Sequence, residues 1–121
     1  MVLRWDVGDP EVDAFVDASL VSFAAWDLVI YLNRNPATCE SAASLAAILA
    51  RHEHDLLPAV RRFVENGLLV EVDSSGDGPL CYSLSADAGA RRVMARFVEL
   101  AGKRDHRLEF VRRVLAHLTA G

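Results

Sequence analysis

Histidine and cysteine are the residues of this sequence best suited to bind a metal ion, and they lie in separate places. His52 and His54 flank Glu53 in the stretch HEH, while Cys39 and Cys81 each stand alone. Two histidines separated by one residue are not a zinc spacing by themselves, and no C-x-x-C pair accompanies them. A Cys/His nucleophile would need a third group to orient the histidine, and none is identifiable. We therefore expect no metal, no cofactor and no enzymatic activity.

A second group with useful chemistry is the pair Arg61 and Arg62, which falls in a stretch of helical pattern. A guanidinium can clamp a phosphate or bridge the O6 and N7 atoms of guanine. Alternatively, both arginines pair with Glu65, three and four residues later, on a solvated helix face that is stabilised by only tenths of a kcal/mol, roughly. The residue types alone do not choose between these alternatives.

The charge of the chain is unevenly distributed. Residues 1–60 carry 3 Arg and 9 Asp or Glu, a net of −6, and residues 61–121 carry 10 Lys or Arg and 8 Asp or Glu, a net of +2. The acidic first half disfavours broad contact with phosphate, whereas the arginines of the second half could form a local positive face. A length of 121 residues fits one domain, and 52% apolar with 25% charged residues is typical of a globular protein.

The chain is expected to be cytoplasmic. Its longest apolar run, from Leu20 to Leu32, is interrupted by Ser22 and Asp27 and is too short to span a bilayer. No secretory signal is readable at the N-terminus. Two cysteines do not make a disulfide framework, so we expect reduced thiols. Because the apolar run is too short to span a bilayer, we expect no membrane partner.

Apolar residues at helical spacing predict helices along the first half of the chain. Asp9 and Pro10 are typical of an N-cap and a first helical position, and they begin a lead helix over residues 9–20. A second apolar stripe ends at NRNP, residues 33–36, because the residue before a proline avoids the α region. Ser41 is expected to cap a third helix.

The fourth helix contains Pro58, which constrains where the helix can begin. A proline is tolerated in the first turn, where its missing N–H has no partner, so the N-cap is expected at about Asp55. If His52 were the N-cap, Pro58 would lie inside the helix at a cost of ~3 kcal/mol. The HEH stretch is therefore expected to be a turn. Asn66 and Gly67 end the helix.

The remaining pattern predicts a β-hairpin and two helices. Residues 68–73 and 80–85 alternate like strands around the turn signal of residues 74–79, and Cys81 is expected on an edge-like strand. Residues 86–119 form the terminal helices. The apolar stripe of the last one is expected to comprise Leu108, Val111, Val114, Leu115 and Leu118.

This order of elements resembles the winged helix-turn-helix superfamily, which includes many bacterial repressors. The matching features, within residues 22–85, are Leu45-Ala46, the Val60/Phe63/Val64 stripe, ENGLL and Tyr82-Ser83-Leu84. The resemblance implies a mainly α (α+β) fold, with a three-helix core (residues 21–85) that carries a β-hairpin wing. A lead helix and a C-terminal helical hairpin complete a single domain of residues 1–121. It further implies a DNA-binding transcriptional regulator.

In such a domain the last core helix enters the major groove and the wing touches phosphate or the minor groove. The candidate DNA-binding residues are Arg51, His54, Arg61, Arg62, Ser74 and Ser75. Pro58 offers no donor, and the turn of the wing has Asp77 but no Lys or Arg. The alternative is therefore a winged-helix protein–protein interaction module without sequence-specific DNA binding. For His54, the alternatives are a pH-sensitive contact and a solvated turn histidine.

The terminal helices also suggest a partner. Their large apolar residues, such as Phe97, Phe110 and Leu115, exceed what a small domain with a short hairpin is expected to cover. We expect a homodimer through the N- and C-terminal helices. The alternative is that these helices fold back on their own domain.

Overall fold

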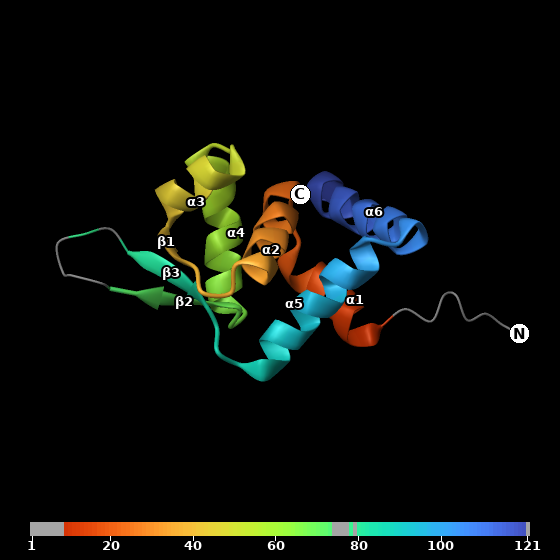
Figure 1. Ribbon diagram of the computed structural model, residues 1–121. Helices are drawn as coiled ribbons and strands as arrows, with labels where there is room; N and C mark the ends of the chain where they lie inside the picture. Colours follow the sequence, from red (N-terminus) through yellow and green to blue (C-terminus); the bar gives the residue numbers. More distant parts are fainter. Residues whose placement is uncertain (1–8, 74–77, 79, 121) are drawn as a thin grey trace, which may run out of the picture.

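The computed structural model describes residues 9–73, 78 and 80–120, which are mainly helical with a small antiparallel sheet (Figure 1). Predictions that fall on Ser74 and Ser75 lie outside these residues. The elements in chain order are α1 (Pro10–Ser19), α2 (Phe23–Arg34), β1 (Cys39–Ser41), α3 (Ala42–Leu49), α4 (Glu53–Glu65), β2 (Leu69–Val72), β3 (Cys81–Leu84), α5 (Ala88–Ala101) and α6 (Arg104–Ala120). The predicted α+β class is confirmed.

The helix starts follow the predicted capping residues. The Asp9 carboxylate accepts hydrogen bonds from the amides of Glu11 (3.0 Å) and Val12 (3.4 Å), ahead of Pro10. The Ser41 hydroxyl accepts from the amide of Ser44 at 3.1 Å and caps α3. These side chains satisfy amides that lack a partner within the helix, which is the reason that Asp and Ser favour this position.

The predicted start of α4 is wrong. The helix begins at Glu53 with His52 as its N-cap, because the amides of Asp55 and Leu56 already donate to the His52 carbonyl at 3.1 and 3.2 Å. Pro58 therefore lies inside the helix. Burial of Leu56 outweighs the missing hydrogen bond, since tertiary packing of an apolar face stabilises a helix more than local preference does.

The end of α4 is as predicted. Gly67 has a left-handed backbone, with φ of 77°, which glycine adopts without steric cost. The amide of Gly67 donates to Val64 O at 3.1 Å, and that of Leu68 donates to Phe63 O at 2.8 Å. Both bonds satisfy carbonyls at the end of the helix and direct the chain into β2.

The sheet has one strand more than the predicted hairpin. Its order is β1-β3-β2, with Ser41 opposite Cys81 and Cys81 opposite Val72. Cys81 therefore lies on the central strand, and its prediction as an edge-like position is wrong. The strand β1 was missed because it has only three residues and runs directly into α3. Its partner β3 lies far along the chain, so no local pattern marks the pairing.

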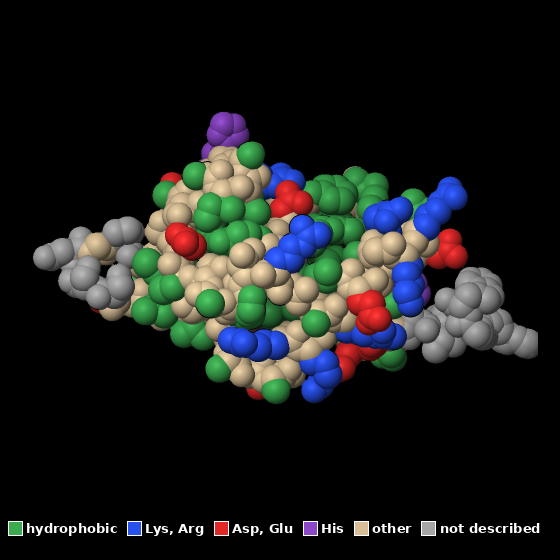
Figure 2. Space-filling model, viewed as in Figure 1, with side chains coloured by type: hydrophobic (Ala, Val, Ile, Leu, Met, Phe, Trp, Pro, Cys, Tyr) green, Lys and Arg blue, Asp and Glu red, His purple; other side chains and the backbone are tan. Residues whose placement is uncertain are grey.

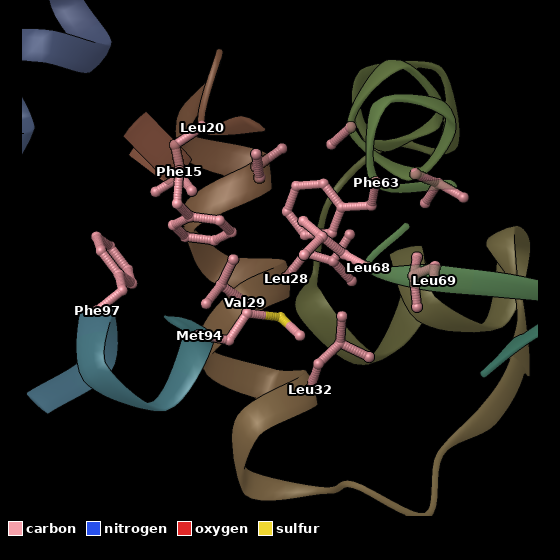
Figure 3. Packing of buried hydrophobic residues seen from close by; sticks show 14 of the residues in the cluster. Phe15, Leu20, Leu28, Val29, Leu32, Phe63, Leu68, Leu69, Met94 and Phe97 are labelled. Carbon is pink, nitrogen blue, oxygen red and sulfur yellow. The ribbon is translucent and has the colours of Figure 1, made fainter. Parts of the chain in front are cut away.

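The terminal helices fold back on the first two helices and share their core. Figure 3 shows Phe63 of α4 and Met94 of α5 pointing into the space beside Val29 of α2. Phe97 of α5 and Phe110 of α6 are 0% and 2% exposed, so each is covered within one chain.

The predicted apolar stripe of α6 is only partly buried. Val114 is fully buried, whereas Leu108, Leu115 and Leu118 are 55%, 47% and 52% exposed. No helix in the described ranges is long and apolar enough to cross a membrane.

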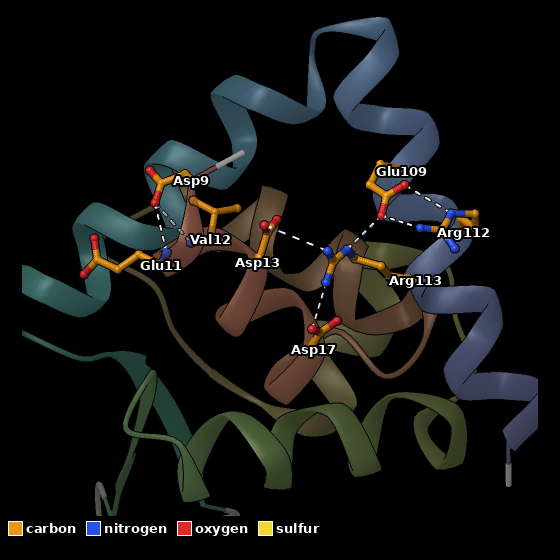
Figure 4. Close-up of polar contacts among 8 residues, drawn as sticks. All are labelled: Asp9, Glu11, Val12, Asp13, Asp17, Glu109, Arg112 and Arg113. Atoms are coloured by element: carbon orange, nitrogen blue, oxygen red, sulfur yellow. Dashed lines mark hydrogen bonds and ion pairs between the residues drawn. The ribbon is translucent and has the colours of Figure 1, made fainter. Parts of the chain in front are cut away.

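An arginine of α6 joins that helix to α1 (Figure 4). The Arg113 guanidinium donates to Asp17 Oδ2 at 2.8 Å and to Glu109 Oε2 at 3.1 Å, and it lies 3.9 Å from Asp13 Oδ2. Glu109 also accepts from Arg112 at 2.6 Å. The hydrogen bonds from Arg112, followed by those from Arg113, lower the pKa of Glu109.

We expect this cluster to weaken in acid. A carboxylate with a lowered folded-state pKa stabilises the fold above its ordinary pKa, and this contribution is lost as the pH falls through the lowered value. Glu109→Gln should therefore cost less than about 1 kcal/mol at neutral pH, because the carboxylate is 39% exposed and screened by water. The difference between the two proteins should shrink once the pH falls below the ordinary pKa of a glutamate, and it should vanish below the lowered pKa of Glu109. Urea unfolding of the parent protein and of Glu109→Gln, from neutral to acidic pH, measures this difference in stability. A difference that grows on acidification would contradict the stabilising role of the Glu109 carboxylate.

Candidate functional site

The helix α4 is packed on one side and open on the other. Leu56, Ala59, Val60 and Phe63 are fully buried where α4 meets α2, α3 and β2. The opposite side carries exposed residues at the positions predicted from helical spacing, namely Pro58, Arg61, Arg62 and Glu65. This open side of α4 is the candidate site.

The two arginines of this side are available for an external partner. Neither Arg61 nor Arg62 makes a hydrogen bond or ion pair within the described part of the chain, so the alternative in which both pair with Glu65 is not formed. Five other arginines each contact a carboxylate, namely Arg51, Arg92, Arg96, Arg112 and Arg113. Within the described residues Arg34 and Arg104 resemble Arg61 and Arg62, because neither has such a partner. The guanidinium donors of Arg61 and Arg62 therefore face solvent, where an anion could accept from them.

Arg51, by contrast, is held inside the domain. Its Nε donates to Asp27 Oδ2 at 2.8 Å, and its Nη2 lies 2.7 Å from the same oxygen. The pair fastens the turn between α3 and α4 to α2, and Ala50 in that turn has a left-handed backbone with φ of 56°. The Asp27 carboxylate neutralises the Arg51 charge, so a continuous positive face through Arg51 and the α4 arginines is not formed.

The first turn of α4 is acidic. Glu53 and Asp55 are exposed beside the amides that an incoming phosphate would use, and a carboxylate there competes with it. His54 Nε2 lies 3.3 Å from Asp55 Oδ1, and the rings of His52 and His54 stack with centroids 5.5 Å apart. Histidine side chains project from the top of the molecule in Figure 2, above the turn between α3 and α4. His54 is therefore a solvated histidine at the helix start.

The metal alternative gains no support from the described residues. Cys39 and Cys81 lie on β1 and β3, whereas His52 and His54 lie at the start of α4. Among the residues that the structure describes, no three His, Cys, Asp or Glu side chains are grouped so that they could hold an ion.

A shallow groove of about 610 Å³ lies between α1, the turn after α4 and the start of α5. Phe15, Leu68 and Val93 contribute apolar surface to it. Asn66, one of its polar residues, donates to Ser19 Oγ at 2.9 Å, so this amide already has a protein partner. Sequence reasoning missed the groove because its walls come from three segments that are far apart in the chain, within residues 11–19, 66–68 and 87–93.

No family model matches this sequence, and the comparisons found neither a curated protein nor a solved structure that is significantly similar to it. The fold and the site alone therefore define the class of this protein. It is an α+β domain in which α4 presents two arginines that have no partner among the described residues.

Proposed function

We propose that this chain is a winged-helix regulator that binds DNA through α4. The observation that carries the proposal is the pair Arg61 and Arg62, exposed on the open side of α4 and unpaired within the described residues. The order of α2, α3, α4 and the β2–β3 hairpin supports it, since this is the order that the resemblance implies. In such an arrangement an exposed helix lies along the major groove.

The acidic first turn limits how α4 can bind. Glu53 and Asp55 repel phosphate, and Pro58 has no backbone N–H to donate, so the contact falls on the C-terminal half of the helix. There Arg61 and Arg62 can bridge guanine O6 and N7 or clamp phosphate oxygens. With so few cations, binding should be tight only at low salt, because phosphate contacts dominate the affinity and weaken as salt rises.

We expect the double substitution Arg61→Ala/Arg62→Ala to weaken binding to DNA selected from a random pool. The loss should be on the order of 10- to 100-fold, and the dependence of log Kd on log salt should fall by about 2. Fluorescence anisotropy with a labelled duplex, titrated at several salt concentrations, measures both quantities.

A matched control is available on α5. Arg91 and Arg92 are also adjacent and exposed, but Arg91 donates to Ser85 O and Arg92 contacts Glu11. The double substitution Arg91→Ala/Arg92→Ala removes the same charge from the protein. It should leave the affinity for DNA within about 3-fold of that of the starting protein, because these arginines do not lie on the helix proposed to enter the groove. Equal losses in both double variants, or no bound DNA at low salt, would overturn the proposal.

The second candidate is a protein-interaction module, and one observation favours it. Ile48 is 47% exposed on α3, next to a turn whose only arginine is neutralised by Asp27. A partner protein that covers this neutral surface would not need cations. Ile48→Lys should abolish capture of such a partner while leaving DNA binding unchanged, and affinity purification with each variant separates the two functions.

A further inference from the structure

The helix α6 is apolar on two sides, and only one of these sides is packed against the rest of the chain. Phe110 and Val114 are buried against the aromatic core. A second stripe consists of Leu108, Val111, Leu115 and Leu118. Its three leucines are about half exposed, and Val111 is partly buried. Hydrophobic side chains gather over α6 in Figure 2, beside Lys and Arg side chains at one end.

The spacing of this stripe is that of a helix–helix seam. Its members follow one another at intervals of three, four and three residues, which is the a/d pattern of a coiled coil. At 100° per residue they lie within about 80° of one another around the helix. Among the described residues, the other large apolar side chains that are comparably exposed are Ile48, Val70 and Leu80, which are scattered over the other end of the fold.

We propose that α6 packs against α6 of a second copy of this chain, antiparallel, around a two-fold axis midway between Val111 and Leu115. A two-fold axis places the same surface on both sides, so Leu108 of one copy lies opposite Leu118 of the other, and Val111 lies opposite Leu115. This self-complementary stripe is continuous along a helix of 17 residues, about 25 Å long.

The charges at the ends of α6 determine the direction. Arg104 and Arg107 lie in its first turn, and Lys103 precedes it; none of the three contacts a carboxylate within the described residues. In an antiparallel pair these cations lie beside the C-terminal carbonyls of the second helix, where positive charge is favourable. In a parallel pair the same cations would face each other and repel. The antiparallel arrangement is therefore preferred.

The flanking charges do not oppose the contact. Arg112 and Arg113 are already paired with Glu109, so neither adds an unpartnered charge beside the middle of the seam. A single helix pair is a small interface, so the dimer should dissociate on dilution. The inference does not rest on DNA binding, because α4 and α6 present different surfaces (Figure 1).

Sedimentation equilibrium over a range of concentrations tests the contact. The double substitution Leu108→Lys/Leu115→Lys should raise the dimer dissociation constant on the order of 100-fold or more, because it places four like charges in the seam. Leu80→Lys replaces a leucine of similar exposure away from α6 and should change it by less than about 2-fold. Both variants should keep the far-UV circular dichroism of the parent, since the replaced side chains are exposed. A parent protein that stays monomeric at every concentration would overturn the proposal, as would a double variant that dimerises normally.

Disulfide trapping tests the direction. In a background with Cys39→Ser/Cys81→Ser, the oxidised double variant Val111→Cys/Leu115→Cys should form a covalent dimer, because these two positions face each other across the two-fold axis. Leu118→Cys should not, because its counterpart lies at the far end of the second helix. Efficient trapping of both would indicate a parallel pair, and trapping of neither would exclude the seam.

Discussion

Replacing Phe97 with alanine should lower the free energy of unfolding by about 3–5 kcal/mol, a large share of the stability of a domain of this size. Phe97 is fully buried, and its ring centroid lies 5.2 Å from that of Trp26 and 5.0 Å from that of Phe110. It also lies 5.8 Å from Phe15. The ring therefore connects α5 to α1, α2 and α6, and its removal leaves a cavity that four helices would have to close.

Urea unfolding followed by circular dichroism measures this loss. Phe23→Ala is the matched control, because Phe23 is only partly buried and its ring centroid lies 6.2 Å from that of Trp26, at the border of the same cluster. We expect the control to lose about half as much stability or less, because the Phe23 side chain buries less apolar surface than Phe97 does in the folded protein. Equal losses for the two variants would show that the cluster is not centred on Phe97.

Replacing Pro58 with alanine should stabilise the protein by about 2 kcal/mol. Pro58 is exposed in the second turn of α4 and cannot donate to the carbonyl of His54, four residues earlier. Alanine restores that hydrogen bond and is ~3 kcal/mol more favourable inside a helix. Part of the gain is offset, by roughly 0.4–1 kcal/mol, because proline restricts the unfolded chain more than alanine does.

The comparison with Pro10 makes this prediction specific. Pro10 occupies the first position of α1, where its missing N–H would have no partner in any case. Pro10→Ala should therefore leave stability unchanged or reduce it slightly. Thermal unfolding of both variants distinguishes the positions. A loss of stability in Pro58→Ala would mean that the proline is required by the packing of α4.

The features predicted correctly from the sequence depend on neighbouring residues. The cap at Asp9 needs amides two and three residues later, and the stop at Gly67 needs a backbone that glycine alone adopts easily. The outward direction of Arg61 and Arg62 follows from the helical repeat of the apolar residues beside them. Each of these features is written within a few residues of the chain.

The features that were missed depend on distant residues. β1 exists because of β3, and the early start of α4 depends on the burial of Leu56. Arg51, one of the candidate site residues, pairs with Asp27, and no local pattern connects these two positions. In the same way, the stripe of α6 could not be divided into buried and exposed sides before the position of α1 was known.

The aromatic cluster has a consequence for how the chain is made. Phe15 is synthesised before two of its partners in the cluster, Phe97 and Phe110, which lie 82 and 95 residues later in the chain. At about 5–20 residues per second, α1 must wait roughly 5–20 seconds for α5 and α6. During this interval the apolar side of α1 is uncovered and available to chaperones. Ribosome-bound chains that end before α5 should therefore associate with them more strongly than the complete protein.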